Sequence, residues 1–143
     1  MAITQTLTDT FLQDCLDGGH NLGNGGDTLK IALYTSSASL GATTSAYTTS
    51  NEVSGTGYTA GGATLSSQAV AFDSSNNVAY FDAADPAFTT ATITARGALI
   101  YNNSQSNASI AVLDFGSDFT STAGTFTIQL PSAAHNTAII RIS

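Results

Sequence analysis

The pattern of hydrophobic and polar positions changes once along the chain. Over residues 5–17 the apolar side chains fall within about half of a helical wheel, namely Leu7, Phe11, Leu12, Cys15 and Leu16. Thr8 or Thr6 can cap a helix here, and Gly18-Gly19 is a typical end signal. The pattern therefore predicts one short amphipathic helix, whose apolar face docks either on its own sheet or on a neighbouring subunit.

After a glycine-rich turn over residues 18–27, the period of the pattern becomes two. Leu29, Ile31 and Leu33 alternate with less apolar residues, which predicts a half-buried strand. Residues 36–62 are rich in Ser, Thr and Gly, and we expect long loops there around one short strand. Further strand-like runs follow: Ala63–Phe72, Val78–Asp82, Ala91–Tyr101, Ser109–Phe115, Thr125–Leu130 and Thr137–Ile142.

Short strands at this spacing, with no helical segments between them, favour a mainly β fold. We expect an antiparallel β-sandwich of jelly-roll or immunoglobulin-like type with one short N-terminal α-helix. Residues 1–27 would form the helix and its Gly-rich linker, and residues 28–143 the sandwich, within a single domain overall. A chain of 143 residues is long enough to bury such a core.

Composition narrows the classes of partner. Only 9% of the residues are charged, and three basic residues (Lys30, Arg96 and Arg141) stand against ten acidic ones, for a net charge of -7. So few cations exclude nucleic acid as a principal partner, and an anionic membrane surface for the same reason. The sequence shows neither a run long enough to span a membrane nor a signal peptide, so we expect synthesis in a cytoplasm.

Candidate catalytic residues are few, and we expect no enzyme and no cofactor. His20 lies in the Gly-rich linker and His135 in the turn after Pro131, so both are predicted to face solvent. No nucleophile-elbow pattern accompanies them. Cys15, the only cysteine, is predicted to act as a small hydrophobic residue on the apolar helix face, and it can form no internal disulfide.

Two carboxylate pairs, Asp82/Asp85 and Asp114/Asp118, are the best candidates for a calcium site. Their spacing does not match an EF-hand, and aspartates of this kind usually shape turns on a solvated rim. We therefore expect no metal site. The predicted core is rich in Ala and lacks Trp, so burial against neighbouring subunits would supplement its stability, which favours an oligomer.

A resemblance to a known family rests on two runs in the middle of the chain. LKIALYTSSASLGA (residues 29–42) and AYTTSNEVSGTGYTAGG (residues 46–62) resemble a segment of small structural proteins of tailed-bacteriophage virions. The runs at 96–101, 110–118, 124–129 and 139–142 also fit, so the resemblance covers most of residues 1–143. The resemblance implies a virion location and a capsid decoration (cement) protein, which stabilises a phage head. The implied partners are the major capsid protein and copies of the chain itself, in a homo-oligomer such as a trimer. It brings no catalytic residues.

Other roles stay open. A neck, tail or tail-tip component belongs to the same class, whereas a glycan-binding or host-receptor module would need an exposed cluster of tyrosines, drawn from Tyr34, Tyr47, Tyr58, Tyr80 and Tyr101. Glu52 is the only charged residue between Lys30 and Asp73. It is either a buried or subunit-bridging carboxylate that accepts backbone N–H bonds, or a solvated loop charge. Tyr47 and Tyr58, on either side of it, are of a type common at interfaces.

Overall fold

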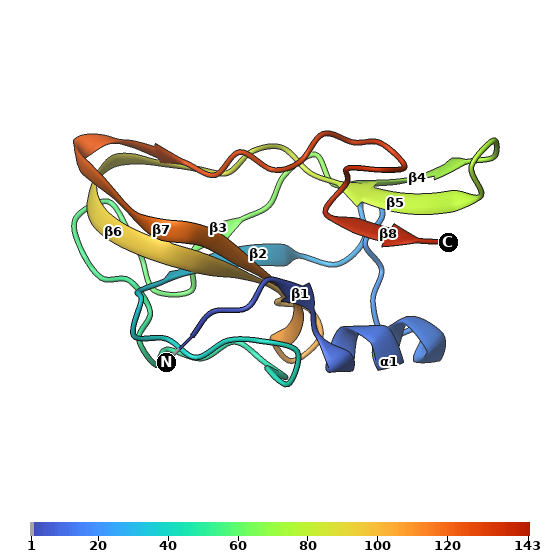
Figure 1. Ribbon diagram of the computed structural model, residues 1–143, viewed down its shortest axis with the longest axis horizontal. Coiled ribbons are helices and arrows are strands. Elements are labelled where there is room, and N and C mark those ends of the chain that lie inside the picture. Colours follow the sequence, from blue (N-terminus) through green and yellow to red (C-terminus); the bar gives the residue numbers. More distant parts are fainter. Residues whose placement is uncertain (1) are drawn as a thin grey trace.

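A computed structural model describes residues 2–143 as two antiparallel sheets and one helix (Figure 1). The larger sheet has the strand order β1-β7-β6-β2-β3, and the smaller has the order β4-β5-β8. The elements are β1 (Thr6–Leu7), α1 (Asp9–Asp17), β2 (Leu29–Tyr34), β3 (Ala63–Thr64), β4 (Ala69–Asp73), β5 (Val78–Asp82), β6 (Ala87–Asn102), β7 (Ala108–Thr127) and β8 (Ile140–Ile142). The prediction of a mainly β, antiparallel fold with one short helix is confirmed. The jelly-roll or immunoglobulin-like type stays a prediction.

The helix is shorter than predicted. The hydroxyl of Thr8 accepts a hydrogen bond from the N–H of Phe11 at 3.3 Å and so caps α1, which ends at Gly18 with φ of 74°. The expected start at residue 5 is wrong, because Thr6–Leu7 pairs with β7 as the edge strand β1. Of the helix residues, Phe11 alone is buried.

Strands β6 and β7 form one long hairpin that bends over at the end of the molecule far from α1 (Figure 1). The expectation of separate strands at Ser109–Phe115 and Thr125–Leu130 is wrong, because β7 runs unbroken through Thr127. Gly116 and Ala123, with φ of 83° and 47°, lie where the register shifts. The strand absorbs its irregular residues as bulges and bends instead of ending.

Two other predicted strands differ in extent. The run Ala63–Phe72 is divided between the sheets, since β3 pairs with β2 and β4 pairs with β5. The break lies between them, where Ser67 has φ of 53°. The run Thr137–Ile142 is a strand only over its last residues, as β8. The short strand expected within residues 36–62 is replaced by isolated bridges, such as Thr56 with Thr92.

Strand β2 is buried on both faces, not half-buried as predicted. Leu29, Ile31 and Leu33 point into the main core. On the opposite face, Ala32 and Tyr34 belong to a second core, which also contains Leu40 and Val112. The loops that follow β2 pack on this face. They bury the side chains that an alternating pattern predicts to be exposed to solvent.

Candidate functional site

The carboxylate of Glu52 is held by three donors. The hydroxyl of Tyr47 donates to Oε2 at 2.7 Å, and the hydroxyl of Tyr58 and the backbone N–H of Gly61 each donate to Oε1 at 2.7 Å. The side chain is partly buried. The prediction of a carboxylate that accepts a backbone N–H bond is confirmed, and a freely solvated loop charge is ruled out.

The tyrosines extend this network into the sheet. The hydroxyl of Tyr58 also accepts a hydrogen bond from the N–H of Leu33 at 2.9 Å, and Tyr101 donates to the carbonyl oxygen of Gly61 at 2.7 Å. Tyr47 stacks on Tyr101 with ring centroids 4.8 Å apart. Burial raises the pKa of Tyr47 and Tyr58, and the bond to Glu52 raises it further. The phenols therefore stay protonated and act as donors.

The backbone around Glu52 lies against two strands. The N–H of Val53 donates to the carbonyl oxygen of Leu33 at 2.9 Å, and the N–H of Thr92 donates to that of Thr56 at 2.9 Å. At Gly62, with φ of 77°, an added Cβ would overlap the backbone carbonyl of Ile31. Residues 51–62 are therefore a packed part of the scaffold, fastened by the Glu52 carboxylate.

The tyrosine cluster expected for a glycan-binding module is present but is not exposed. Tyr34 and Tyr101 are 0% and 2% exposed, and Tyr47 and Tyr58 are partly buried around Glu52. Tyr80 lies in β5, in the other sheet. The structure thus gathers four of the five tyrosines as an internal network, which presents no aromatic platform to a sugar.

His20 is buried, so the expectation that it faces solvent is wrong. Its side chain is 2% exposed, Nδ1 lies 2.9 Å from Nδ2 of Asn102, and Nε2 lies 3.3 Å from Oδ2 of Asp14 without a hydrogen bond. The cause is Asp27, whose carboxylate accepts bonds from Asn102 and from the backbone of Asn21, and so folds the Gly-rich linker onto the end of β6. These contacts make His20 a packing residue between α1 and the sheet.

His135 and Cys15 lie at the surface. The side chain of His135 is 38% exposed with Nδ1 3.2 Å from Oδ2 of Asp73, which fits the prediction of a loop residue. Cys15 is exposed, so its predicted place on a docked helix face is wrong. Partial desolvation, together with the charge of Asp14, raises the pKa of the thiol, which lowers its thiolate fraction.

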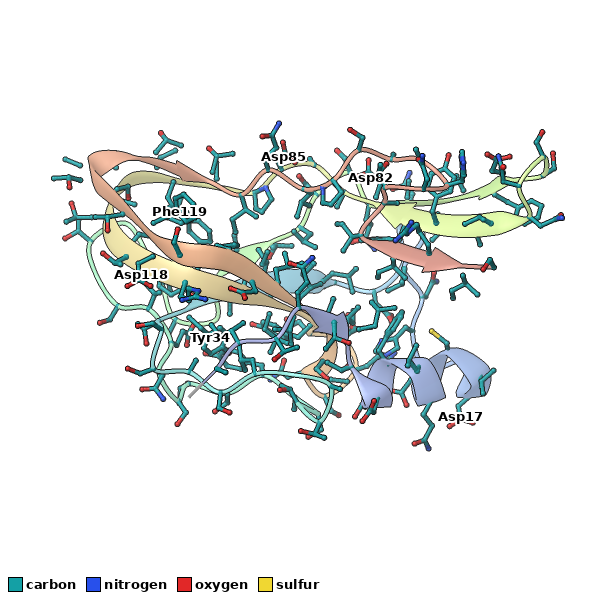
Figure 2. The ribbon with its side chains drawn as sticks, viewed as in Figure 1. Asp17, Tyr34, Asp82, Asp85, Asp118 and Phe119 are labelled. Carbon is teal, nitrogen blue, oxygen red and sulfur yellow. The ribbon has the colours of Figure 1, made fainter. Side chains whose placement is uncertain are left out.

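One member of each carboxylate pair accepts a hydrogen bond from a backbone N–H. Asp114 accepts bonds from the N–H of Gly116 at 2.9 Å and from Nε of Arg96 at 3.1 Å, which together lower its pKa. Asp85 accepts from the N–H of Leu130 at 2.8 Å. Figure 2 shows Asp82, the last residue of β5, and Asp85, between β5 and β6, away from Asp118 on β7. Within residues 2–143, no three or more His, Cys, Asp or Glu side chains are grouped so as to hold a metal ion.

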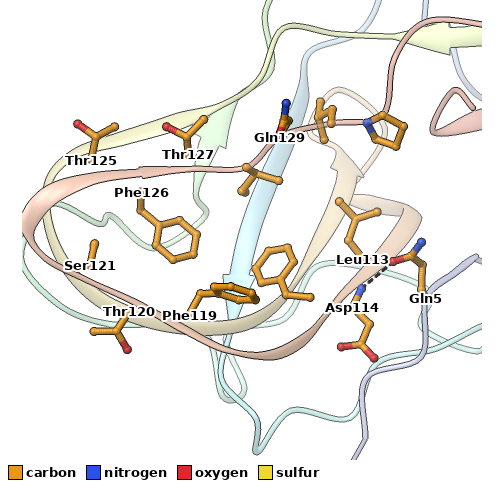
Figure 3. A pocket seen from close by; sticks show the side chains of 14 residues that line it. Gln5, Leu113, Asp114, Phe119, Thr120, Ser121, Thr125, Phe126, Thr127 and Gln129 are labelled. Atoms are coloured by element: carbon orange, nitrogen blue, oxygen red, sulfur yellow. Dashed lines mark hydrogen bonds between the residues drawn. The ribbon is translucent and has the colours of Figure 1, made fainter.

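A groove of about 600 Å³ lies on the concave side of the bent strand β7 (Figure 3). Its apolar wall contains Phe115, which meets Phe119 edge-on with ring centroids 6.4 Å apart. Thr120, Thr125 and Thr127 also line the groove, and Asp114, the only ionisable side chain of the lining, is bound to Arg96. No local pattern in the sequence predicts this groove, because it arises from the bend of β7 near Gly116 and Ala123.

Exposed apolar side chains gather at one end of the molecule. Among the described residues, six large apolar side chains are half or more exposed. Five of them lie on α1, β4 and β8, which share the end opposite the hairpin bend (Figure 1): Leu12, Leu16, Val70, Phe72 and Ile142. We call these five residues the apolar end. Exposed apolar side chains in such number at one end of a molecule are typical of an interaction surface.

Within residues 2–143 there is no helix whose length and apolar character would let it cross a membrane. Comparisons with protein-family models, with curated proteins and with solved structures found no match to this chain.

Proposed function

We propose that this chain is a structural protein of a virion, a capsid decoration (cement) protein that binds the major capsid protein and copies of itself on a phage head. The observation that carries the proposal is the apolar end, where a chain with few charges exposes Val70, Phe72 and their neighbours on a rigid scaffold. Apolar surface of this kind supports association with other proteins.

The resemblance over residues 29–62 supports the same role. This segment contains β2 and the Glu52 loop, which is fastened to β2 through Tyr58 and Val53 and to β6 through Thr56. A decoration protein needs such rigidity, because each ordered contact then costs less conformational entropy on binding. The resemblance is most specific over residues 51–62, a part of the chain that serves as scaffold.

The net negative charge of the chain is compatible with a position on a phage head that is filled with DNA. A net charge of -7 gives no attraction for the genome inside the shell. Many weak contacts repeated over a symmetric lattice add up to tight attachment, so no single contact has to be strong. The chain would work by clamping neighbouring capsid subunits.

Co-sedimentation tests the proposal. Particles of the parent phage that lack the chain are mixed with purified protein, pelleted, and the bound copies are counted against the major capsid protein. We expect binding in proportion to the capsid subunits, and none by protein that was first heat-unfolded. Protein left wholly in the supernatant would contradict the proposal. Binding limited to a single ring of copies would contradict the place on the head and favour the neck or tail.

A further inference from the structure

Strand β4 is an open edge. It pairs with β5 on one side and is the terminal strand of the smaller sheet. Its first four residues, Ala69 to Phe72, are exposed on both faces. Natural edge strands usually carry Lys, Pro or a bulge that blocks pairing with another chain, and β4 carries none of these. Its outward N–H and C=O groups are thus free to accept another strand.

The apolar face of β4 continues the core of the molecule. Val70 pairs with Phe81, and Phe81 pairs with Ile140, so all three lie on one face of the sheet. Phe81 and Ile140 are buried at 1% and 3% exposure, whereas Val70 is 54% exposed and Phe72, two residues along on the same face, is 64% exposed. The apolar face of the smaller sheet therefore extends to the edge strand β4, where its side chains are exposed to solvent.

We propose that β4 is the contact through which two copies of this chain associate, with β4 of each copy paired antiparallel about a two-fold axis at Ala71. This inference deepens the self-association within the proposed function. In that register Val70 lies opposite Phe72 of the partner subunit, and both lie on the apolar face. Such an isologous contact closes after two copies, so it makes a six-stranded sheet from two three-stranded ones.

The charge pattern of β4 permits a second copy in this register. Each chain has a net charge of -7, so two copies can meet closely only where their carboxylates are apart. The one charge of β4 is Asp73, at its end, where the proposed register places it opposite Ala69 of the partner subunit. Asp73 also lies 3.2 Å from Nδ1 of His135 of its own chain. No two carboxylates face each other across the contact.

The other edge of the small sheet is less open. Arg141 of β8 lines a cavity of about 280 Å³ together with Leu7 of β1 and Ala111 of β7. The outer side of β8 thus faces the body of its own chain. This leaves β4 as the edge available to a partner.

Sedimentation of the free protein tests the inference with a matched pair of variants. We expect the unaltered chain to sediment at twice 14.5 kDa. Val70→Lys adds a gatekeeper charge to the edge and should weaken the dimer about tenfold or more. Ser117→Lys adds the same charge at an exposed position of β7 and should leave the dimer intact. A monomeric unaltered chain, or equal association of both variants, would overturn the inference.

A cross-link tests the register itself. In a Cys15→Ser background, Ala71→Cys should oxidise to a disulfide-linked dimer, because the proposed axis brings the two Ala71 positions within disulfide distance. Ser117→Cys in the same background should migrate as a monomer on a non-reducing gel. Circular dichroism confirms that each variant is folded. Equal cross-linking by both variants, or none by Ala71→Cys, would overturn the register.

The outcomes separate this inference from the proposed function. A monomeric chain that still binds particles in proportion to capsid subunits would overturn the β4 contact and leave the decoration role in place. A β4 dimer that fails to bind particles would support the contact and contradict the role.

Discussion

Tyr58 joins the Glu52 carboxylate to strand β2. Its hydroxyl donates to Glu52 Oε1 at 2.7 Å and accepts from the N–H of Leu33 at 2.9 Å. One phenol thus satisfies both a loop charge and a strand N–H that would otherwise lack a partner. Hydrogen bonds to charged groups contribute more than neutral ones, so the pair is a stability determinant of the fold.

Removing the Glu52 carboxylate should destabilise the fold. Glu52→Ala leaves the hydroxyls of Tyr47 and Tyr58 and the N–H of Gly61 without their acceptor. We expect a loss of about 2–4 kcal/mol in the free energy of unfolding, measured in urea, and about 1 kcal/mol for Glu52→Gln, which keeps one acceptor oxygen.

A matched control for this change is Asp118→Ala. Asp118 is the exposed acid of β7, so its removal should alter the free energy of unfolding by at most about 0.5 kcal/mol. Equal effects of Glu52→Ala and Asp118→Ala would show that the network does not stabilise the fold.

The tyrosines should resist ionisation in alkali. Burial raises the pKa of Tyr34, Tyr47, Tyr58 and Tyr101, and the charge of Glu52 raises it further. In the unfolded chain these phenols ionise near pH 10. Because their folded pKa values are higher, the stabilisation is complete below about pH 10 and is lost as pH rises through those values.

Phenolate absorbance followed against pH measures this directly. Four of the five phenols should titrate late, together with the loss of the circular dichroism signal. If these four ionised near pH 10 while the chain stayed folded, the buried network would be disproved.

Gly62 and Gly18 provide a test of close packing. Both have positive φ, 77° and 74°, so an alanine is strained at either position. Only at Gly62 would the new Cβ overlap a backbone carbonyl, that of Ile31, whereas at Gly18 it meets open space. We expect thermal unfolding to show a loss of about 1 kcal/mol for Gly18→Ala and more than about 3 kcal/mol, or failure to fold, for Gly62→Ala. Similar losses would mean that residues 51–62 do not lie close to β2.

Asp27 should make the linker sensitive to acid. The backbone N–H of Asn21 and the side chain of Asn102 lower its pKa below the ordinary value of 3.8. A lowered folded pKa gives stability that is present above 3.8 and lost as pH falls through the folded value. The difference in stability between the unaltered chain and Asp27→Asn should be constant from neutral pH down to about 5 and shrink below 3.8. A difference that does not change with pH would contradict this role.

Short sequence patterns correctly predicted strand β2 and the capping residues of helix α1. The period of two at Leu29, Ile31 and Leu33 identified β2, and Thr8 and Gly18 mark the two ends of α1 as capping chemistry predicts. Glu52 stood out as a lone charge, and one of its two expected environments is the one found.

The errors have non-local causes. The burial of His20 depends on Asn102, which is 82 residues away in the chain and cannot be paired with it from sequence. The two strands expected at Ser109–Phe115 and Thr125–Leu130 form one strand, β7, because β7 stays paired with β6 on both sides of the bulges near Gly116 and Ala123. The groove and the apolar end likewise arise from how distant strands meet, and periodicity does not encode that.

Thermal rupture of whole particles is the most direct test of the decoration role. Phage particles with the chain, particles without it, and the latter after addition of purified protein are heated while released DNA is measured with a dye. The account predicts that particles without the chain release DNA at a lower temperature and that added protein restores the higher one. Identical release temperatures for all three would contradict the claim that this chain stabilises a phage head.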